Sequence, residues 1–293
     1  MRAVERFLAA IHRHPRWGWA GLIVYAALVT FPHEQVQLLI GKISFYTGLK
    51  LIYQTSAAVT VTLGIVFTLV VIRRTAGRPE RRVVLGYWLL TLALIGGTWR
   101  LLTANNTELV HYPQYVPEGL ALVALTLSPV ESIAWVTILG GLDEGNQYAF
   151  LTTGRAVPFD FNDIYMDLLG GTIGVLLGVA LLPGDGRGQT WKGTWTGILK
   201  RPGVAAVLSI VGAGVVLWAL GLMRLHDDKI NPHYWFSLSH SDPSMPWLLN
   251  RAWSTHKFHE LVPVEGPILI LATLAIYAAL DRRVRVSIEP PKR

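Results

Sequence analysis

Three aspartates open one apolar segment at spacings that place them on a single helical face. Asp160, Asp163 and Asp167 are three and four residues apart, so their carboxylates should follow one another along one side of a helix. Glycines at 170 or 171, 174 and 178 continue the same stripe into the apolar part. Ionisable groups at membrane depth are costly and usually functional, whereas spaced glycines indicate close helix packing. The segment therefore predicts an acidic site above a tight helix contact.

A second polar cluster ends the preceding apolar segment and runs into a short loop: Asp143, Glu144, Gln147 and Arg155. Capping and the helix dipole explain Asp160 or Asp163 at a helix N-terminus. They do not explain Asp167, which lies about one turn deeper. A carboxylate there needs Arg155, a cation or a proton to compensate its burial.

A third group lies upstream, where His111, Tyr115 and Glu118 are spaced to share one helical face. Pro113 and Pro117 interrupt the stretch, so we expect the helix to begin near Pro117, where a missing backbone N–H costs little. Glu118 would then lie in the first turn and be stabilised there by the helix dipole.

These residue types together permit acid–base chemistry. Glu144 or Asp167 would act as base or acid. Arg155 would hold a phosphate or carboxylate, and His111 would shuttle a proton. The candidate catalytic residues are Glu144, Asp167 and His111, and the candidate substrate-binding residues are Arg155, Gln147, Glu118, Tyr115 and Asp163.

Composition places these clusters in a polytopic membrane protein. Apolar residues make up 52% of the chain and charged residues 15%, and the apolar residues fall in long runs. The sequence predicts an all-α transmembrane helical bundle with about eight spans: 17–32, 51–72, 83–99, 116–130, 131–145, 164–183, 203–223 and 263–280. The fourth and fifth are short, with Pro129 and Glu131 in the turn between them. They either cross the membrane or form a re-entrant hairpin, and two crossings agree better with the charge distribution.

Basic residues predict the orientation. Of the 26 Lys and Arg, 18 lie in the N-terminal arm, the 73–82 and 184–202 loops and the C-terminal tail. The positive-inside rule therefore predicts that both termini are cytoplasmic, in a bacterial plasma or inner membrane. The first span lacks a small-residue cleavage pattern and is interpreted as a retained helix. The sequence has no basic patch interleaved with aromatic residues, so we expect no nucleic-acid partner. The absence of Cys excludes disulfides and a Cys nucleophile.

The last outer loop, about 224–262, is rich in histidine. His256, His259 and Glu260 are compatible with a shared metal-ligand set, but no strict zinc signature is present. We assign no metal site and leave the cofactor unknown. The segment Met245 to Ser254 is interpreted instead as an interfacial amphipathic helix.

Together these residues resemble the VanZ-like family of integral membrane proteins. The resemblance is carried by Asp143-Glu144, Gln147, Arg155, Asp163, position 167, Gly171 with Gly174, and upstream His111 and Tyr115. It covers about 108–178, and it departs from the family pattern where Asp167 replaces the usual Asn. The resemblance implies a membrane and cell-envelope setting. The founding member is linked to low-level teicoplanin resistance, and the biochemical activity of the family is unsettled.

The predicted organisation has three parts: N-terminal transmembrane helices at 1–107, a VanZ-like core at 108–183, and two C-terminal helices with the long loop at 184–293. Two functions fit them. An enzyme would process a lipid-linked or envelope glycan substrate at the outer leaflet. A non-catalytic scaffold, or a transporter or binder of an amphiphile or cation, would use the same cluster for binding. No Ser-His-Asp order, P-loop or kinase pattern favours the enzyme, and no pair of broken helices favours a secondary transporter.

Overall fold

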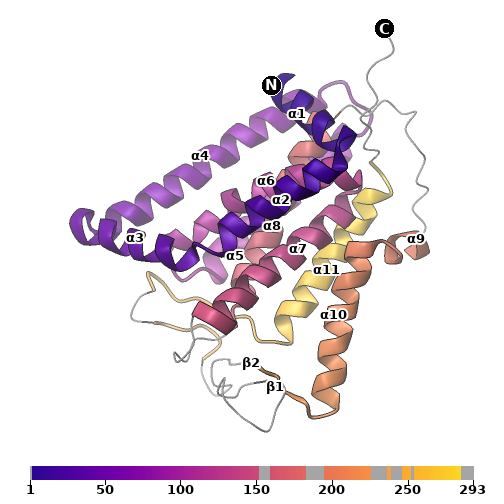
Figure 1. Ribbon diagram of the computed structural model, residues 1–293. Coiled ribbons are helices and arrows are strands. Elements are labelled where there is room, and N and C mark those ends of the chain that lie inside the picture. Colours follow the sequence, from indigo (N-terminus) through magenta and orange to yellow (C-terminus); the bar gives the residue numbers. More distant parts are fainter. Residues whose placement is uncertain are drawn as a thin grey trace.

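The computed structural model describes residues 2–151, 159–182, 195–225, 236–238, 246–251 and 254–284. These residues form a helical bundle, which confirms the all-α prediction (Figure 1). The helices are α1 (Arg2–Arg13), α2 (Pro15–Thr30), α3 (His33–Thr47), α4 (Leu49–Thr75), α5 (Arg81–Leu101), α6 (His111–Thr126), α7 (Pro129–Asn146), α8 (Phe161–Leu181), α9 (Trp195–Leu199), α10 (Pro202–Ala219) and α11 (Glu265–Asp281).

Shorter elements connect these helices. A 3-10 turn η1 (Asn106–Val110) precedes α6, and a π turn η2 (Gln147–Leu151) follows α7. Strands β1 (Met223–Leu225) and β2 (Phe236–Leu238) pair in parallel, with Met223 opposite Phe236. The sequence patterns predicted neither the strands nor α3.

Four described helices are long and apolar enough to cross a membrane: α4, α5, α8 and α10. The prediction of about eight spans is not supported. Each of the other four predicted segments does contain a helix, but α2, α6 and α11 have 16, 16 and 17 residues. At 1.5 Å per residue they fall short of a hydrocarbon core of about 30 Å. The fifth segment, α7, has 18 residues but carries three acids, at 131, 143 and 144.

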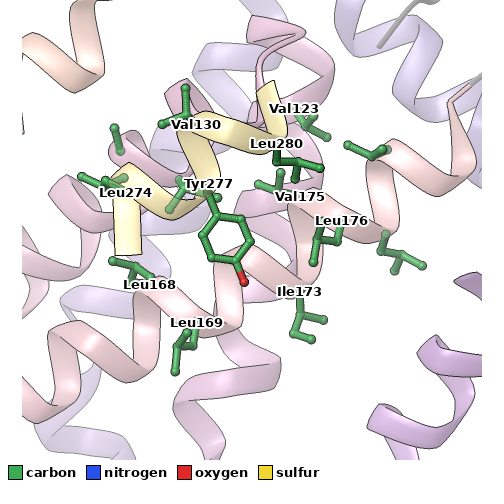
Figure 2. Close-up of a cluster of buried hydrophobic side chains, with 14 of the residues drawn as sticks. Val123, Val130, Leu168, Leu169, Ile173, Val175, Leu176, Leu274, Tyr277 and Leu280 are labelled. Atoms are coloured by element: carbon green, nitrogen blue, oxygen red, sulfur yellow. The ribbon is translucent and has the colours of Figure 1, made fainter. Parts of the chain in front are cut away.

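Helix α8 lies at the centre of the bundle, in contact with α4, α5, α6, α7 and α11. Its apolar stretch is wholly buried by the protein, whereas α4, α5 and α10 expose most of theirs. Figure 2 shows how the core closes on one side, where Tyr277 of α11 points among Leu169, Ile173 and Leu176 of α8. The Tyr277 hydroxyl is hydrogen-bonded to Thr91 of α5. A buried aromatic ring with a satisfied hydroxyl thus joins three helices.

The glycine stripe of α8 packs against α6, as the sequence predicts. A Cβ atom on Gly174 would overlap the backbone carbonyl of Val116, and one on Gly170 would lie 2.5 Å from the Tyr112 carbonyl oxygen. On the facing helix, a Cβ on Gly119 would overlap the Gly171 carbonyl. Glycine is required at these positions because the two backbones touch without intervening side chains.

Several basic and acidic groups tie the helix ends together at one end of the bundle. Arg78, between α4 and α5, donates to the carbonyls of Val179 at 3.2 Å and Leu182 at 3.0 Å, at the end of α8. Arg201 before α10 pairs with Asp281 at the end of α11, 2.6 Å apart. The described parts of the predicted basic segments therefore lie at one end of the bundle. The starts of α6, α8 and α11 lie at the other end.

Helix α6 begins earlier than predicted. It starts at His111 rather than near Pro117, because η1 leads directly into it. Pro113 falls in the first turn, where no intrahelical donor is needed, and Pro117 remains inside the helix at the cost of one backbone hydrogen bond. Glu118 therefore lies in the second turn, and its interpretation as a first-turn residue is wrong.

The predicted amphipathic helix at Met245–Ser254 is also wrong. The described part, 246–251, is not helical. Instead Leu249 and Phe258 exchange backbone hydrogen bonds of 2.7 and 3.0 Å in an antiparallel bridge. This isolated bridge, between residues nine apart in the chain, replaces the hydrogen bonds that a helix would require.

Candidate functional site

Seven polar side chains form one cluster, here called the three-helix site, where the starts of α6 and α8 meet the end of α7. It comprises His111, Tyr115 and Glu118 of α6, Asp143 and Glu144 of α7, and Asp163 and Asp167 of α8. All are buried except the partly exposed Asp163. The predicted spacings of three and four residues on α6 and α8 bring these groups to facing sides of two helices that touch through glycine.

His111 and Asp167 form the central contact. Nδ1 of His111 lies 2.9 Å from Oδ1 of Asp167, and Nε2 lies 3.7 Å from Oδ2 of Asp163. His111 and Asp167 are almost fully buried, at 6% and 1% exposed. Because an ionised carboxylate only accepts hydrogen bonds, Nδ1 of His111 donates in this contact when Asp167 is ionised. Among the described residues, His111 is the partner of Asp167. From the sequence, we expected Arg155, a cation or a proton in this role.

Deeper in the bundle, Tyr115 connects the three helices. Its hydroxyl donates to Oδ2 of Asp143 on α7 at 3.3 Å, and it interacts with Asp167 as well. Glu118, the next acid along α6, lies near the same two aspartates. Three carboxyl groups from three helices therefore surround one buried phenol.

The outer rim of the site is held by hydrogen bonds to the loops. Glu144 accepts from the Asp160 backbone N–H at 2.9 Å, and Asp160 caps α8 by accepting from Asn162 N–H at 2.8 Å. The Asn162 side chain donates to the Leu102 and His259 carbonyls and accepts from Leu261 N–H. Asn162 therefore links the segment at Leu102 to the segment at 259–261, next to the site.

Glu108 of η1 adds a further acid at this rim. It accepts from Ala104 N–H at 2.8 Å and from the Asn105 side chain at 3.2 Å. Burial, followed by the nearby Asp163 carboxylate, raises the pKa of Glu108 to about 8. Burial also raises the pKa of Asp160. Both carboxyl groups are therefore weaker acids than usual and keep their protons to a higher pH.

This rim predicts a pH dependence of stability. The Glu108 pKa is about 8 in the folded protein against 4.5 in its ordinary environment. The folded state therefore keeps a proton that the unfolded chain releases, and stability falls as pH rises from about 4.5 to 8. We expect Glu108→Gln to reduce this loss of stability by at most about 5 kcal/mol, measured by unfolding in detergent at a series of pH values. The control is Glu80→Gln outside the site, and an equal slope in both variants would contradict the assignment.

Gly140 gives the Asp167 side chain its space. A Cβ at Gly140 would lie 2.8 Å from Oδ2 of Asp167, whereas a Cβ at the adjacent Gly141 would meet nothing within 4 Å. We expect Gly140→Ala to displace the carboxylate and destabilise the protein by about 1–3 kcal/mol, and Gly141→Ala to leave stability unchanged or slightly improved. Thermal unfolding of the two variants in the same detergent tests this, and equal midpoints would show that Asp167 does not pack on α7.

The remaining predicted residues are placed as follows. Gln147 follows α7 as the first residue of η2, with its backbone N–H bonded to the carbonyls of Asp143 and Glu144. Arg155 lies outside the described residues. Asn162 and Glu108 are rim residues that the site assignment omitted. Glu108 carried a signal, as an acid three residues before His111, but the partners of Asn162 are too distant in sequence to be foreseen.

The histidines of the last loop do not form a metal centre in the described part of the chain. His259 faces Glu265 through Nε2 at 2.7 Å and the Trp247 carbonyl through Nδ1 at 2.8 Å, and the Trp247 ring stacks on it. Both ring nitrogens are therefore occupied by protein groups. Across the described residues, no three His, Cys, Asp or Glu side chains are arranged to hold a metal ion.

No family model, no curated protein and no solved structure matches this chain. The resemblance to VanZ-like proteins therefore depends on the motif residues alone. Any function must be argued from the chemistry of the three-helix site.

Proposed function

We propose that this chain is a multi-pass membrane protein of the VanZ-like kind, whose three-helix site performs acid–base chemistry on a lipid-linked or envelope substrate at the extracytoplasmic face. The observation that carries the proposal is the buried His111–Asp167 pair, 2.9 Å apart. An ionised Asp167 orients the imidazole and holds its hydrogen on Nδ1. Nε2 is left as the basic nitrogen, facing Asp163 at the partly exposed end of α8.

The orientation follows from the distribution of charge. The contacts of Arg78 and Arg201 draw basic segments to one bundle end, and the positive-inside rule puts that end in the cytoplasm of a bacterial inner membrane. The three-helix site then faces outward. Single cysteines at Gly77 and Lys257 of this Cys-free chain test the orientation. An impermeant thiol reagent added outside should label position 257 and spare position 77, and the reverse pattern would overturn it.

The reaction is tested by comparing envelope lipids and lipid-linked glycans by mass spectrometry in a bacterial host. The host would express the wild type, His111→Asn or His256→Asn, where His256 is a matched histidine outside the site. A species altered by the wild type should change about 100-fold more slowly with His111→Asn, because a lost acid–base group costs at least that much. His256→Asn should behave as the wild type. A change that persists in His111→Asn would contradict catalysis at this site.

The second candidate is a non-catalytic binder or transporter of an amphiphile or cation. It is favoured by one observation, the surplus of carboxylates around Tyr115. His111 is the basic side chain that contacts Asp163 and Asp167. Such a site attracts positive charge whether or not a bond is broken. In the mass-spectrometry experiment, a binder would co-purify an unaltered species with the protein.

A further inference from the structure

A groove lies between α1, α2 and α6, away from the three-helix site (Figure 1). It has a volume of about 440 Å³, and its walls are mainly apolar, among them Phe7, Ile11, Leu22 and Ala121. Walls of this kind offer few partners to a polar ligand but can bury a hydrocarbon chain.

The length of the groove matches the depth of one membrane leaflet. It runs along α2 from Trp17 to Tyr25, which both line it. Eight helical residues span about 12 Å, and half of a hydrocarbon core of about 30 Å is about 15 Å. At the Tyr25 end, the hydroxyl group donates to the Gln114 carbonyl at 2.7 Å. The protein therefore satisfies this polar group itself, and the end of the groove is suited to the end of a lipid tail.

The other end of the groove opens among exposed polar residues. His14 and Trp17 line it there, and Trp17 is 80% exposed, as is typical of a tryptophan at the membrane–water interface. Two exposed arginines, Arg13 and Arg16, lie within two residues of His14. Nε of Arg13 donates to the Ala9 carbonyl at 3.2 Å, which holds its guanidinium against the last turn of α1. These arginines lie outside the groove, where the headgroup of a lipid projects when its tail is inside.

The positive charge at this opening is not balanced by the two helices that form it. The one acid of α1 and α2 is Glu5, and it pairs with Arg74 of α4. Neither Arg13 nor Arg16 makes an ion pair within the described part of the chain. Arginines at a helix end beside an apolar slot attract an anionic headgroup, and a phosphate suits the guanidinium best.

We propose that this groove binds one tail of an anionic phospholipid and that Arg13 and Arg16 hold its phosphate. Because lipid tails are as apolar as core leucines, the groove itself selects little between lipids. The charge of the headgroup decides. The inference goes beyond the proposed function, since the lipid is a resident ligand rather than a substrate and touches none of the seven residues of the three-helix site. It would hold the corner between α1 and α2 against α6.

The headgroup is tested by native mass spectrometry of the full-length protein, released from maltoside micelles that contain equal amounts of dioleoyl phosphatidylglycerol and dioleoyl phosphatidylcholine. The wild type should retain phosphatidylglycerol about tenfold more than phosphatidylcholine. Arg13→Gln combined with Arg16→Gln should bring the two lipids close to equal retention. The control, Arg81→Gln with Arg82→Gln, removes the same charge from exposed residues of α5 at the same bundle end and should keep the preference.

The tail is tested by filling the groove. Gly21 lines the groove, and a Cβ atom there would meet nothing within 4 Å, so Gly21→Trp places its indole in the groove without displacing the protein. This variant should lose both lipids. Gly214→Trp on α10 is the control, because a Cβ there also meets nothing within 4 Å, and it should retain them. Glycerol 3-phosphate, which has the charge but no tail, should not bind to the wild type.

Four outcomes would overturn the inference. They are equal retention of the two lipids by the wild type, a preference that survives loss of Arg13 and Arg16, a preference lost equally with Arg81 and Arg82, and lipid retention by Gly21→Trp. Binding of glycerol 3-phosphate would contradict the role of the tail. If Gly21→Trp does not fold, the exposed arginine variants still decide. His111→Asn should retain the lipid as the wild type does, so this inference and the acid–base proposal fail separately.

Discussion

Replacing Gly174 by Ala should destabilise this protein by about 3 kcal/mol, at the upper end of the cost of overpacking a core. The added methyl group would overlap the Val116 carbonyl, a backbone atom of α6 that cannot move aside as a flexible side chain does. Helices α6 and α8 would have to separate, and the two faces of the three-helix site would separate with them. The same reasoning applies to Gly119, whose added methyl would overlap the Gly171 carbonyl.

Gly97→Ala in α5 is the matched control, because a Cβ there would meet nothing within 4 Å. This variant should be neutral, or more stable by roughly 0.5–1 kcal/mol through higher helix propensity. Unfolding in detergent with a chemical denaturant measures both variants. Equal unfolding free energies for Gly174→Ala and Gly97→Ala would show that α6 and α8 are not in backbone contact.

The second large effect is expected at Asp167. Asp167→Ala leaves His111 buried without its partner, and breaking a buried pair in this way costs roughly 3–5 kcal/mol. Asp167→Asn should cost much less, because the amide oxygen can still accept from Nδ1 and the side chain has nearly the same size. Thermal unfolding of the two variants tests the ranking. A cost for Asn as large as for Ala would mean that the ionised carboxylate itself, rather than an acceptor at this position, holds the imidazole.

Helical spacing made much of this site predictable. The three- and four-residue intervals of His111, Tyr115 and Glu118 hold in the structure because α6 is continuous through both prolines. The glycine stripe of α8 was informative for the same reason, since a residue without a side chain at one face of an apolar helix implies a close neighbour. Local periodicity thus gave the helices and the faces that they turn to one another.

Other features depend on contacts between residues that are distant in sequence. Asn162 is important because it reaches the carbonyls of Leu102 and His259. Nearer in sequence, the bridge between Leu249 and Phe258 replaces a helix that local amphipathicity favoured. Apolar composition predicted about eight spans, but only four described helices are long and apolar enough to cross a membrane. Helices α2, α6 and α11 are shorter, and α7 carries three acids.

The central claim is that His111 and Asp167 act as one unit at the centre of the three-helix site. A double-mutant cycle on unfolding free energy in detergent, with His111→Ala, Asp167→Ala and the double variant, measures this directly. The 2.9 Å contact predicts a coupling energy on the order of 2–3 kcal/mol, with the double variant less damaged than the sum of the single ones. A coupling near zero would mean that the two residues do not share a site, and the proposed acid–base centre would be contradicted.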